Sequence, residues 1–170
     1  MGYRAENLFR LLRAATPTVL GLFGVIMLAL PVRLFEGFVP TPILPLVIIY
    51  FWSIYGSDYM PAPSVFIIGL LQDLLTGGPL GLWAGVYLLT QFIVLTQRSY
   101  FAGREQKVVW IGFGFALASA CLIVWLVMSL MSGQVLPVGV LLAQMVATFF
   151  MYPVLSIVFN ELHRRVLVEV

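Results

Sequence analysis

Residues 69–85 have the sequence GLLQDLLTGGPLGLWAG, and this stretch decides how the rest of the chain is interpreted. It places one carboxylate, Asp73, inside an otherwise apolar run. A carboxylate at membrane depth costs about 2.5–3.5 kcal/mol on insertion scales, so it normally faces protein or water rather than lipid. We therefore expect Asp73 to point into the molecule.

The spacing around Asp73 predicts a helical hairpin. On a helix, steps of three and four residues share one face. One such face of small and polar residues comprises Ala62, Val65, Gly69, Gln72, Asp73 and Thr76. Gly77, Gly78 and Pro79 should end this helix, because Gly accepts left-handed backbone angles and Pro cannot continue a helix. The next helix opens with Gly81 and Gly85, a GxxxG pair that predicts close approach of two helices.

The composition indicates an all-α integral membrane protein. Of the 170 residues, 62% are hydrophobic and 9% are charged, with a mean hydropathy of +1.06. A soluble domain of this size cannot bury so much apolar surface. The single cysteine, Cys121, excludes an internal disulfide and a cysteine metal cluster.

Six membrane-spanning helices in one bundle are predicted. The third is opened by Pro61 and Pro63 and ends at Thr76, and the other five have the ranges 16–34, 41–55, 80–96, 108–131 and 138–159. Residues 1–15 form a basic amphipathic segment, 16–160 the transmembrane domain, and 161–170 a cytoplasmic tail. Aromatic residues near the end of the second helix, among them Tyr50 and Trp52, suggest a headgroup boundary.

The distribution of basic residues predicts that both termini are cytoplasmic. With six spans, the N-terminus, the 56–62 and 97–107 loops and the C-terminal tail share one side of the membrane. That side carries eight of the nine basic residues, and only Arg33 lies opposite. If the short third segment were re-entrant, three basic residues of the 97–107 loop would move outside, against the positive-inside rule.

Catalytic, cofactor and metal sites are not expected. The only histidine, His163, lies in the tail beside two arginines, and one His with one Cys cannot assemble a metal site of these ligands. The topology separates Asp58 and Asp73 to opposite membrane faces, which excludes an aspartyl pair. For Asp73 two roles stay open: a structural one, capping or pairing within the bundle or with a partner helix, and ligand or proton binding.

Two further stripes run along the last two helices. The fifth helix carries small residues at Gly112, Ala116 and Ala120, which predicts close packing. The sixth carries polar residues at four-residue steps: Gln144, Thr148, Tyr152, Ser156 and Asn160. We expect interhelical hydrogen bonds from this polar stripe, and a solute-lined cavity is the alternative.

The core from Gly69 through Asp73 to Pro79-Leu80-Gly81, preceded by Tyr50-Phe-Trp and Pro61, resembles the rod shape-determining MreD family. The resemblance extends to chain length, six spans and a basic N-terminus. Carried over, the family motif falls on Gly69, Asp73, Pro79 and Gly81, with Gly77 and Gly78 in the turn between them. Gln72 and Gly85 complete the candidate packing and partner-binding positions.

The resemblance implies a bacterial inner-membrane subunit of the cell-elongation complex without catalytic activity. Its partners would be the bitopic protein MreC and, through it, MreB, RodA and penicillin-binding protein 2. The fold would be similar to the S subunits of energy-coupling-factor transporters. A small-solute-binding transporter subunit of the same architecture is the alternative function.

Overall fold

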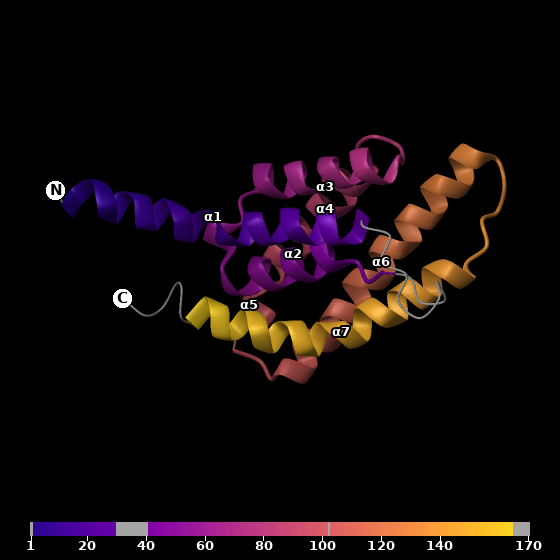
Figure 1. Cartoon of the computed structure of the whole chain (residues 1–170). Coiled ribbons are helices and arrows are strands. Elements are labelled where there is room, and N and C mark those ends of the chain that lie inside the picture. Colours follow the sequence, from indigo (N-terminus) through magenta and orange to yellow (C-terminus); the bar gives the residue numbers. More distant parts are fainter. Residues whose placement is uncertain (1, 30–40, 102, 165–170) are drawn as a thin grey trace.

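The computed structural model describes residues 2–29, 41–101 and 103–164, and within these ranges the chain is helical with no strand. The elements are α1 (Gly2–Ala29), α2 (Leu44–Tyr55), the 3₁₀ turn η2 (Ser57–Tyr59), α3 (Ala62–Thr76), α4 (Leu82–Thr96), α5 (Arg98–Phe101), α6 (Gln106–Ser132) and α7 (Gly139–His163). Figure 1 shows these helices as one bundle.

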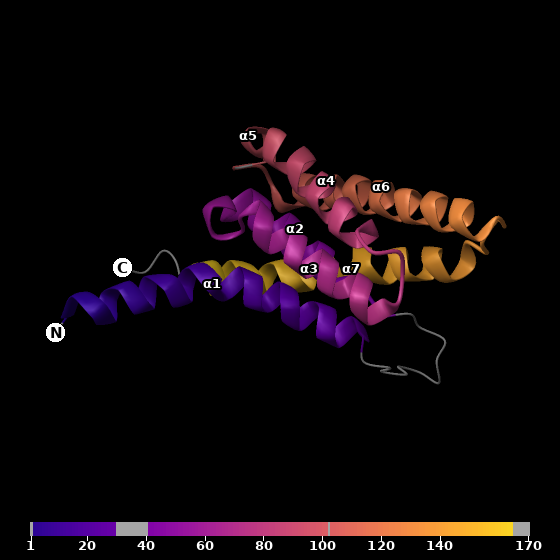
Figure 2. The same ribbon diagram turned by 90° about the horizontal axis from the view of Figure 1, so that it is seen from above.

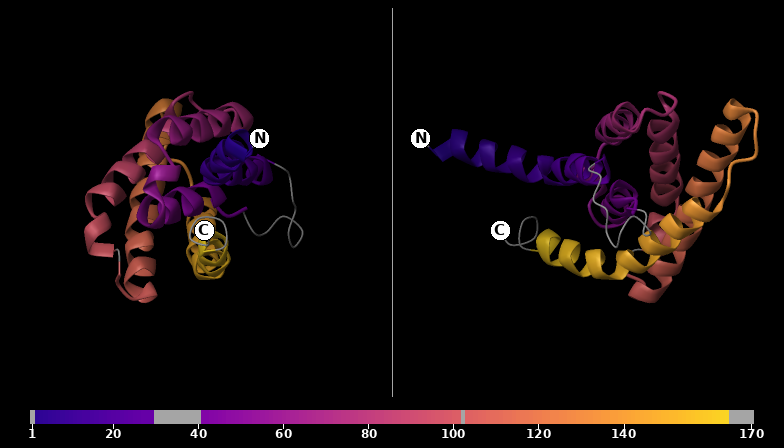
Figure 3. Two further views of the ribbon diagram at one scale, coloured as in Figure 1. Left: turned by 90° about the vertical axis from the view of Figure 1, so that its left-hand side faces the viewer. Right: turned by 45° about the vertical axis from the view of Figure 1, so that its right-hand side comes forward.

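Helix α2 is the centre of the bundle. Every residue from Pro45 to Ile54 is buried, on all sides of the helix. Helices α1, α4, α6 and α7 all pack against α2, as the end-on view on the left of Figure 3 shows. A helix that is apolar all round is a core helix or a membrane span. Here its partners cover it completely.

The surrounding helices have the opposite pattern, with large apolar side chains exposed on their outer faces. Examples are Phe92 on α4 at 69% exposure, Phe115 on α6 at 76% and Ile157 on α7 at 66%. Helices α6 and α7 are each long and apolar enough to cross a membrane by length and composition. The apolar parts of α1, α2, α3 and α4 are shorter.

The long helices run successively back and forth along the bundle (Figure 1). Helix α7 ends on the side where α1 begins, and the α3–α4 and α6–α7 turns both lie toward the opposite end. The α6–α7 turn projects beyond the α3–α4 turn, as Figure 2 also shows. No residue from Trp125 to Ala147 is buried in this projecting hairpin.

Most predicted helix positions agree with the structure to within a few residues. The third helix, predicted to open at Pro61 and Pro63 and to end at Thr76, begins at Ala62 and ends at Thr76. The predicted division at residue 15 does not coincide with a helix end, because α1 runs unbroken from Gly2 to Ala29. The short helix α5 inside the 97–107 loop was not predicted. Arg33, and with it the first loop, lies outside the described residues.

The aromatic residues of α2 lie in the core, so the predicted headgroup boundary is wrong for Tyr50 and Trp52. Their exposed fractions are 1% and 0%. The Tyr50 ring contacts Phe113 and Tyr152 edge-on, with centroids 5.2 and 5.7 Å apart. Aromatic rings in this geometry add to core packing, and their place in the sequence does not distinguish core from interface.

The polar stripe of α7 makes hydrogen bonds to other segments at three of its five positions, Gln144, Thr148 and Ser156, and one of these bonds joins two helices. Gln144 Nε2 donates to the Thr41 carbonyl at 2.9 Å, and the Ile43 amide donates to Thr148 Oγ1 at 3.0 Å. Ser156 Oγ accepts from Gln106 Nε2 on α6. The first two bonds satisfy backbone groups of the non-helical residues 41–43 just before α2. Non-helical backbone is tolerated at membrane depth when protein satisfies it in this way.

Candidate functional site

The motif residues come together at the α3–α4 turn. Helix α3 ends at Thr76, whose hydroxyl donates to the Gln72 carbonyl at 2.8 Å. Gly77 then adopts the left-handed conformation (φ 67°), and Gly81 does so again immediately before α4 (φ 93°). A side chain is strained at such angles, so these two glycines allow the tight return. The predicted helix stop is confirmed.

The Asp73 carboxylate caps helix α4 across this turn. Gly81 N–H donates to Oδ2 at 2.8 Å and Trp83 N–H donates to Oδ1 at 2.9 Å, while Ala84 N–H lies 3.5 Å from Oδ2. The first amides of a helix have no partner within the helix, and its N-terminus carries partial positive charge. At 1% exposure, Asp73 therefore supplies both the missing acceptors and the compensating charge.

Gly69 permits the two helices to lie close enough for this capping. A Cβ at position 69 would lie 2.3 Å from the Cα of Ala84 and 2.5 Å from its backbone nitrogen. Both are backbone atoms, so no side-chain rotation relieves the overlap. Close approach of backbones is what small residues provide between membrane helices.

The GxxxG pair Gly81 and Gly85 was predicted to let another helix approach closely, and this is wrong for packing within the chain. A Cβ at either glycine meets nothing within 4 Å, and both residues are exposed. The glycine that makes the close contact is Gly69 on α3, which fits against Ala84, the residue preceding Gly85. The four-residue spacing of small residues indicates that they share one face of a helix. It does not indicate whether that face points into the bundle or outward.

A second buried polar contact lies one turn further along α4. The Tyr87 hydroxyl donates to Gln72 Oε1, and both residues are fully buried. Gln72 Nε2 has no hydrogen-bond partner among the described residues. Gln72 was predicted as a site residue but Tyr87 was not, because an isolated tyrosine in an apolar helix carries no signal of its partner.

The remaining motif residues complete the turn. Gly78 and Pro79 lie between the two left-handed glycines, and the Pro79 carbonyl accepts from Leu82 N–H at 3.2 Å. Thus Gly69, Gln72, Asp73, Gly77, Gly78, Pro79 and Gly81 form one α3–α4 unit, and Gly85 lies outside its interior. We call this unit the capped hairpin.

Comparison of the chain with protein-family models, curated proteins and solved structures finds no match. The resemblance to the MreD family and to transporter S subunits accordingly stays a prediction. In the structure the motif residues have a specific structural role, because they join α3 to α4.

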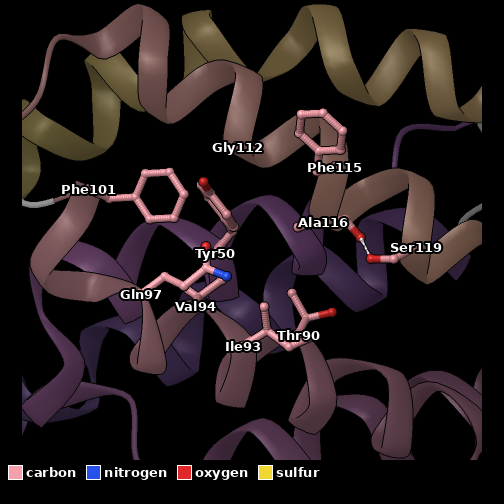
Figure 4. A pocket seen from close by; sticks show the side chains of 10 residues that line it. All are labelled: Tyr50, Thr90, Ile93, Val94, Gln97, Phe101, Gly112, Phe115, Ala116 and Ser119. Carbon is pink, nitrogen blue, oxygen red and sulfur yellow. Dashed lines mark hydrogen bonds between the residues drawn. The ribbon is translucent and has the colours of Figure 1, made fainter.

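A cavity of about 390 Å³ lies between α4 and α6, beside Tyr50 of α2 and Phe101 of α5 (Figure 4). Its remaining lining residues are Thr90, Ile93, Val94 and Gln97 on α4, and Gly112, Phe115, Ala116 and Ser119 on α6. The predicted small-residue stripe of α6 thus lines an open space at Ala116. Gly112 is tightly confined, because a Cβ there would lie 2.6 Å from the Phe101 ring, and Ala120 is buried in the core at 1% exposure.

Side chains that could ligate a metal ion are not gathered together among the described residues. These residues contain no group of three His, Cys, Asp or Glu side chains near enough to hold a metal ion. Asp58 is exposed in η2, at the opposite end of α3 from Asp73. The His163 ring lies 5.6 Å from that of Trp52, centroid to centroid.

Proposed function

We propose that the chain is a six-span inner-membrane protein that serves as a non-enzymatic scaffold of the bacterial cell-elongation complex. The observation that carries the membrane part is the contrast between a wholly buried α2 and the exposed apolar side chains on the helices around it. Lipid on the outer faces removes that exposed apolar surface from water.

The charges and the chain path support cytoplasmic termini. Between Lys107 and Glu161 the sequence has no charged residue, so the α6–α7 turn carries none. The 97–107 loop carries three basic residues and lies at the other end of α6. Basic loops favour the cytoplasmic side.

Reporter fusions test this topology. Fusions after residue 36 or 134 are expected to report an extracytoplasmic position, and fusions after residue 102 or 170 a cytoplasmic one. A cytoplasmic signal at residue 134 contradicts the six-span arrangement, because the α6–α7 turn would then share a side with the basic loop.

The capped hairpin supports a scaffold over a carboxylate-dependent transporter. Three backbone amides already surround the Asp73 carboxylate, so this group serves the fold. A rigid hairpin with an apolar outer face, exposing Ile67, Leu74 and Leu75, suits contact with lipid or a partner's membrane helix. The MreD resemblance names that partner as MreC.

Purification from bacterial membranes discriminates the two functions. A scaffold is expected to retain a bitopic partner, identified by mass spectrometry as an MreC-type protein, and depletion of the chain should round rod-shaped cells. Retention of a water-soluble small molecule, with no membrane partner and normal cell shape, would instead favour the solute-binding transporter subunit.

A further inference from the structure

The cavity between α4 and α6 has walls that are chemically apolar despite their hydroxyl groups. Thr90 Oγ1 donates to the Val86 carbonyl at 2.8 Å and Ser119 Oγ donates to the Ala116 carbonyl at 2.9 Å. The Tyr50 hydroxyl donates to the Val109 carbonyl at 3.0 Å. All three hydroxyl protons are therefore used within the protein. A polar solute entering here would lose hydration with little in return.

The cavity borders the exposed apolar surface of the bundle. Ile93 and Phe115 line it, and their exposed fractions are 41% and 76%. Under the membrane location proposed above, the side of the cavity formed by these two residues faces hydrocarbon. A volume of about 390 Å³ falls in the range of roughly 300–1,000 Å³ typical of ligand sites. Its natural occupant is thus a flexible apolar chain supplied by the bilayer.

Basic residues follow directly after one side of the cavity, although no charged side chain lines it. Gln97 and Phe101 line that side, and the segment that follows holds Arg104 and Lys107, both exposed, with one acidic residue between them. The Arg104 guanidinium carbon lies 5.1 Å from the centre of the Tyr100 ring. The guanidinium of Arg98 is already bonded to the Ile54 carbonyl and Ser57 Oγ. Arg104 and Lys107 therefore present the charge that an anionic headgroup would meet.

We propose that the α4–α6 cavity binds one acyl chain of an anionic phospholipid, with its phosphate beside Arg104 and Lys107. The apolar walls accommodate the chain, and the two cations select the headgroup. Each basic side chain near a membrane surface strengthens binding of anionic lipid by about fivefold. This inference rests on the membrane location in the proposed function, and it is independent of the identity of any protein partner.

Native mass spectrometry of the full chain in detergent, with equal amounts of dioleoyl phosphatidylglycerol and dioleoyl phosphatidylcholine, tests the site. Wild type is expected to retain one phosphatidylglycerol with a preference of about fivefold or more. Ala116→Phe fills the cavity and should reduce retention at least about tenfold, judged from the one-ring volume it adds to a ligand-sized space. Arg104→Gln with Lys107→Gln should abolish the headgroup preference.

Ala143→Phe is the matched control, because Ala143 is exposed on α7 away from the cavity, and it should bind like wild type. Ser119→Leu fills the cavity from its rim and replaces Ala116→Phe if that variant does not fold. Wild-type lipid retention in a folded cavity-filling variant overturns the proposal. Equal retention of the two lipids by wild type also overturns the proposal. So does a cavity-filling variant that loses a bound partner protein rather than a bound lipid.

Failure of the proposed function is measured separately. If an alkaline carbonate wash releases the chain from bacterial membranes, the membrane location itself is wrong. If the chain stays in the membrane fraction but binds no lipid in this cavity, only the lipid site is rejected.

Discussion

Replacing Asp73 with alanine is expected to lower the free energy of unfolding by about 3 kcal/mol, because it strips the α4 N-terminus of its acceptors. Two amides, those of Gly81 and Trp83, lose bonds of 2.8 and 2.9 Å inside a buried turn. At about 2–4 °C per kcal/mol for a chain of this size, the melting temperature should fall by roughly 6–12 °C. Thermal melts of the purified chain in detergent measure this without any partner.

Asp73→Asn keeps one carbonyl acceptor and should lose about half as much stability. Asp58→Ala is the matched control, since Asp58 is an exposed carboxylate at the other end of α3, and its melt should equal that of wild type. If Asp73→Ala melts normally but no longer retains MreC, the carboxylate serves the partner rather than the hairpin. Rounded cells are expected in either case.

Gly69→Ala is expected to cost about 2–3 kcal/mol, which is a large penalty for one methyl group. The added Cβ would overlap the Ala84 backbone, so α3 and α4 must move apart. Their separation also lengthens the bonds from Asp73 to α4, so the two effects arise together. The melting temperature and the yield of folded protein both report this loss.

Gly85→Ala provides the comparison at the neighbouring helix. A Cβ at this position meets nothing within 4 Å, and alanine favours a helix interior by about 0.5–1 kcal/mol over glycine. Gly85→Ala should therefore match or slightly exceed wild-type stability. If Gly85→Ala destabilised the isolated chain and Gly69→Ala did not, the assignment of the close contact would be reversed.

Local signals in the sequence predicted the helices well. The ends of α3 follow from Pro61 at its N-cap, Pro63 in its first turn and Gly77 after it, all of which act within a few residues. The inward direction of Asp73 followed from the cost of burying charge in lipid. Its partners could not be predicted, because the amides of Gly81 and Trp83 reach it only through the two left-handed glycines of the turn.

Long-range packing was the part that the sequence left open. An apolar run such as 44–55 has the same pattern whether lipid or protein surrounds it, so the burial of Tyr50 and Trp52 was not foreseen. The α4–α6 cavity was also not predictable, because it depends on how two separate helices pack against each other. The α7 polar stripe was predicted to form interhelical hydrogen bonds, because unpaired polar groups in apolar surroundings require partners. This prediction holds for Ser156, which bonds to α6, whereas Gln144 and Thr148 bond to the non-helical segment before α2.

The central position of α2 has a consequence for synthesis of the chain. The segment just before α2 depends on α7, since the Ile43 amide and the Thr41 carbonyl bond to Thr148 and Gln144, more than one hundred residues later. Contacts between residues so distant in sequence form late in folding, because closing the long loop between them costs conformational entropy. While the ribosome is still making α7, an early helix therefore remains with one side uncovered. The nascent protein reaches its final packing only when its last helix is complete.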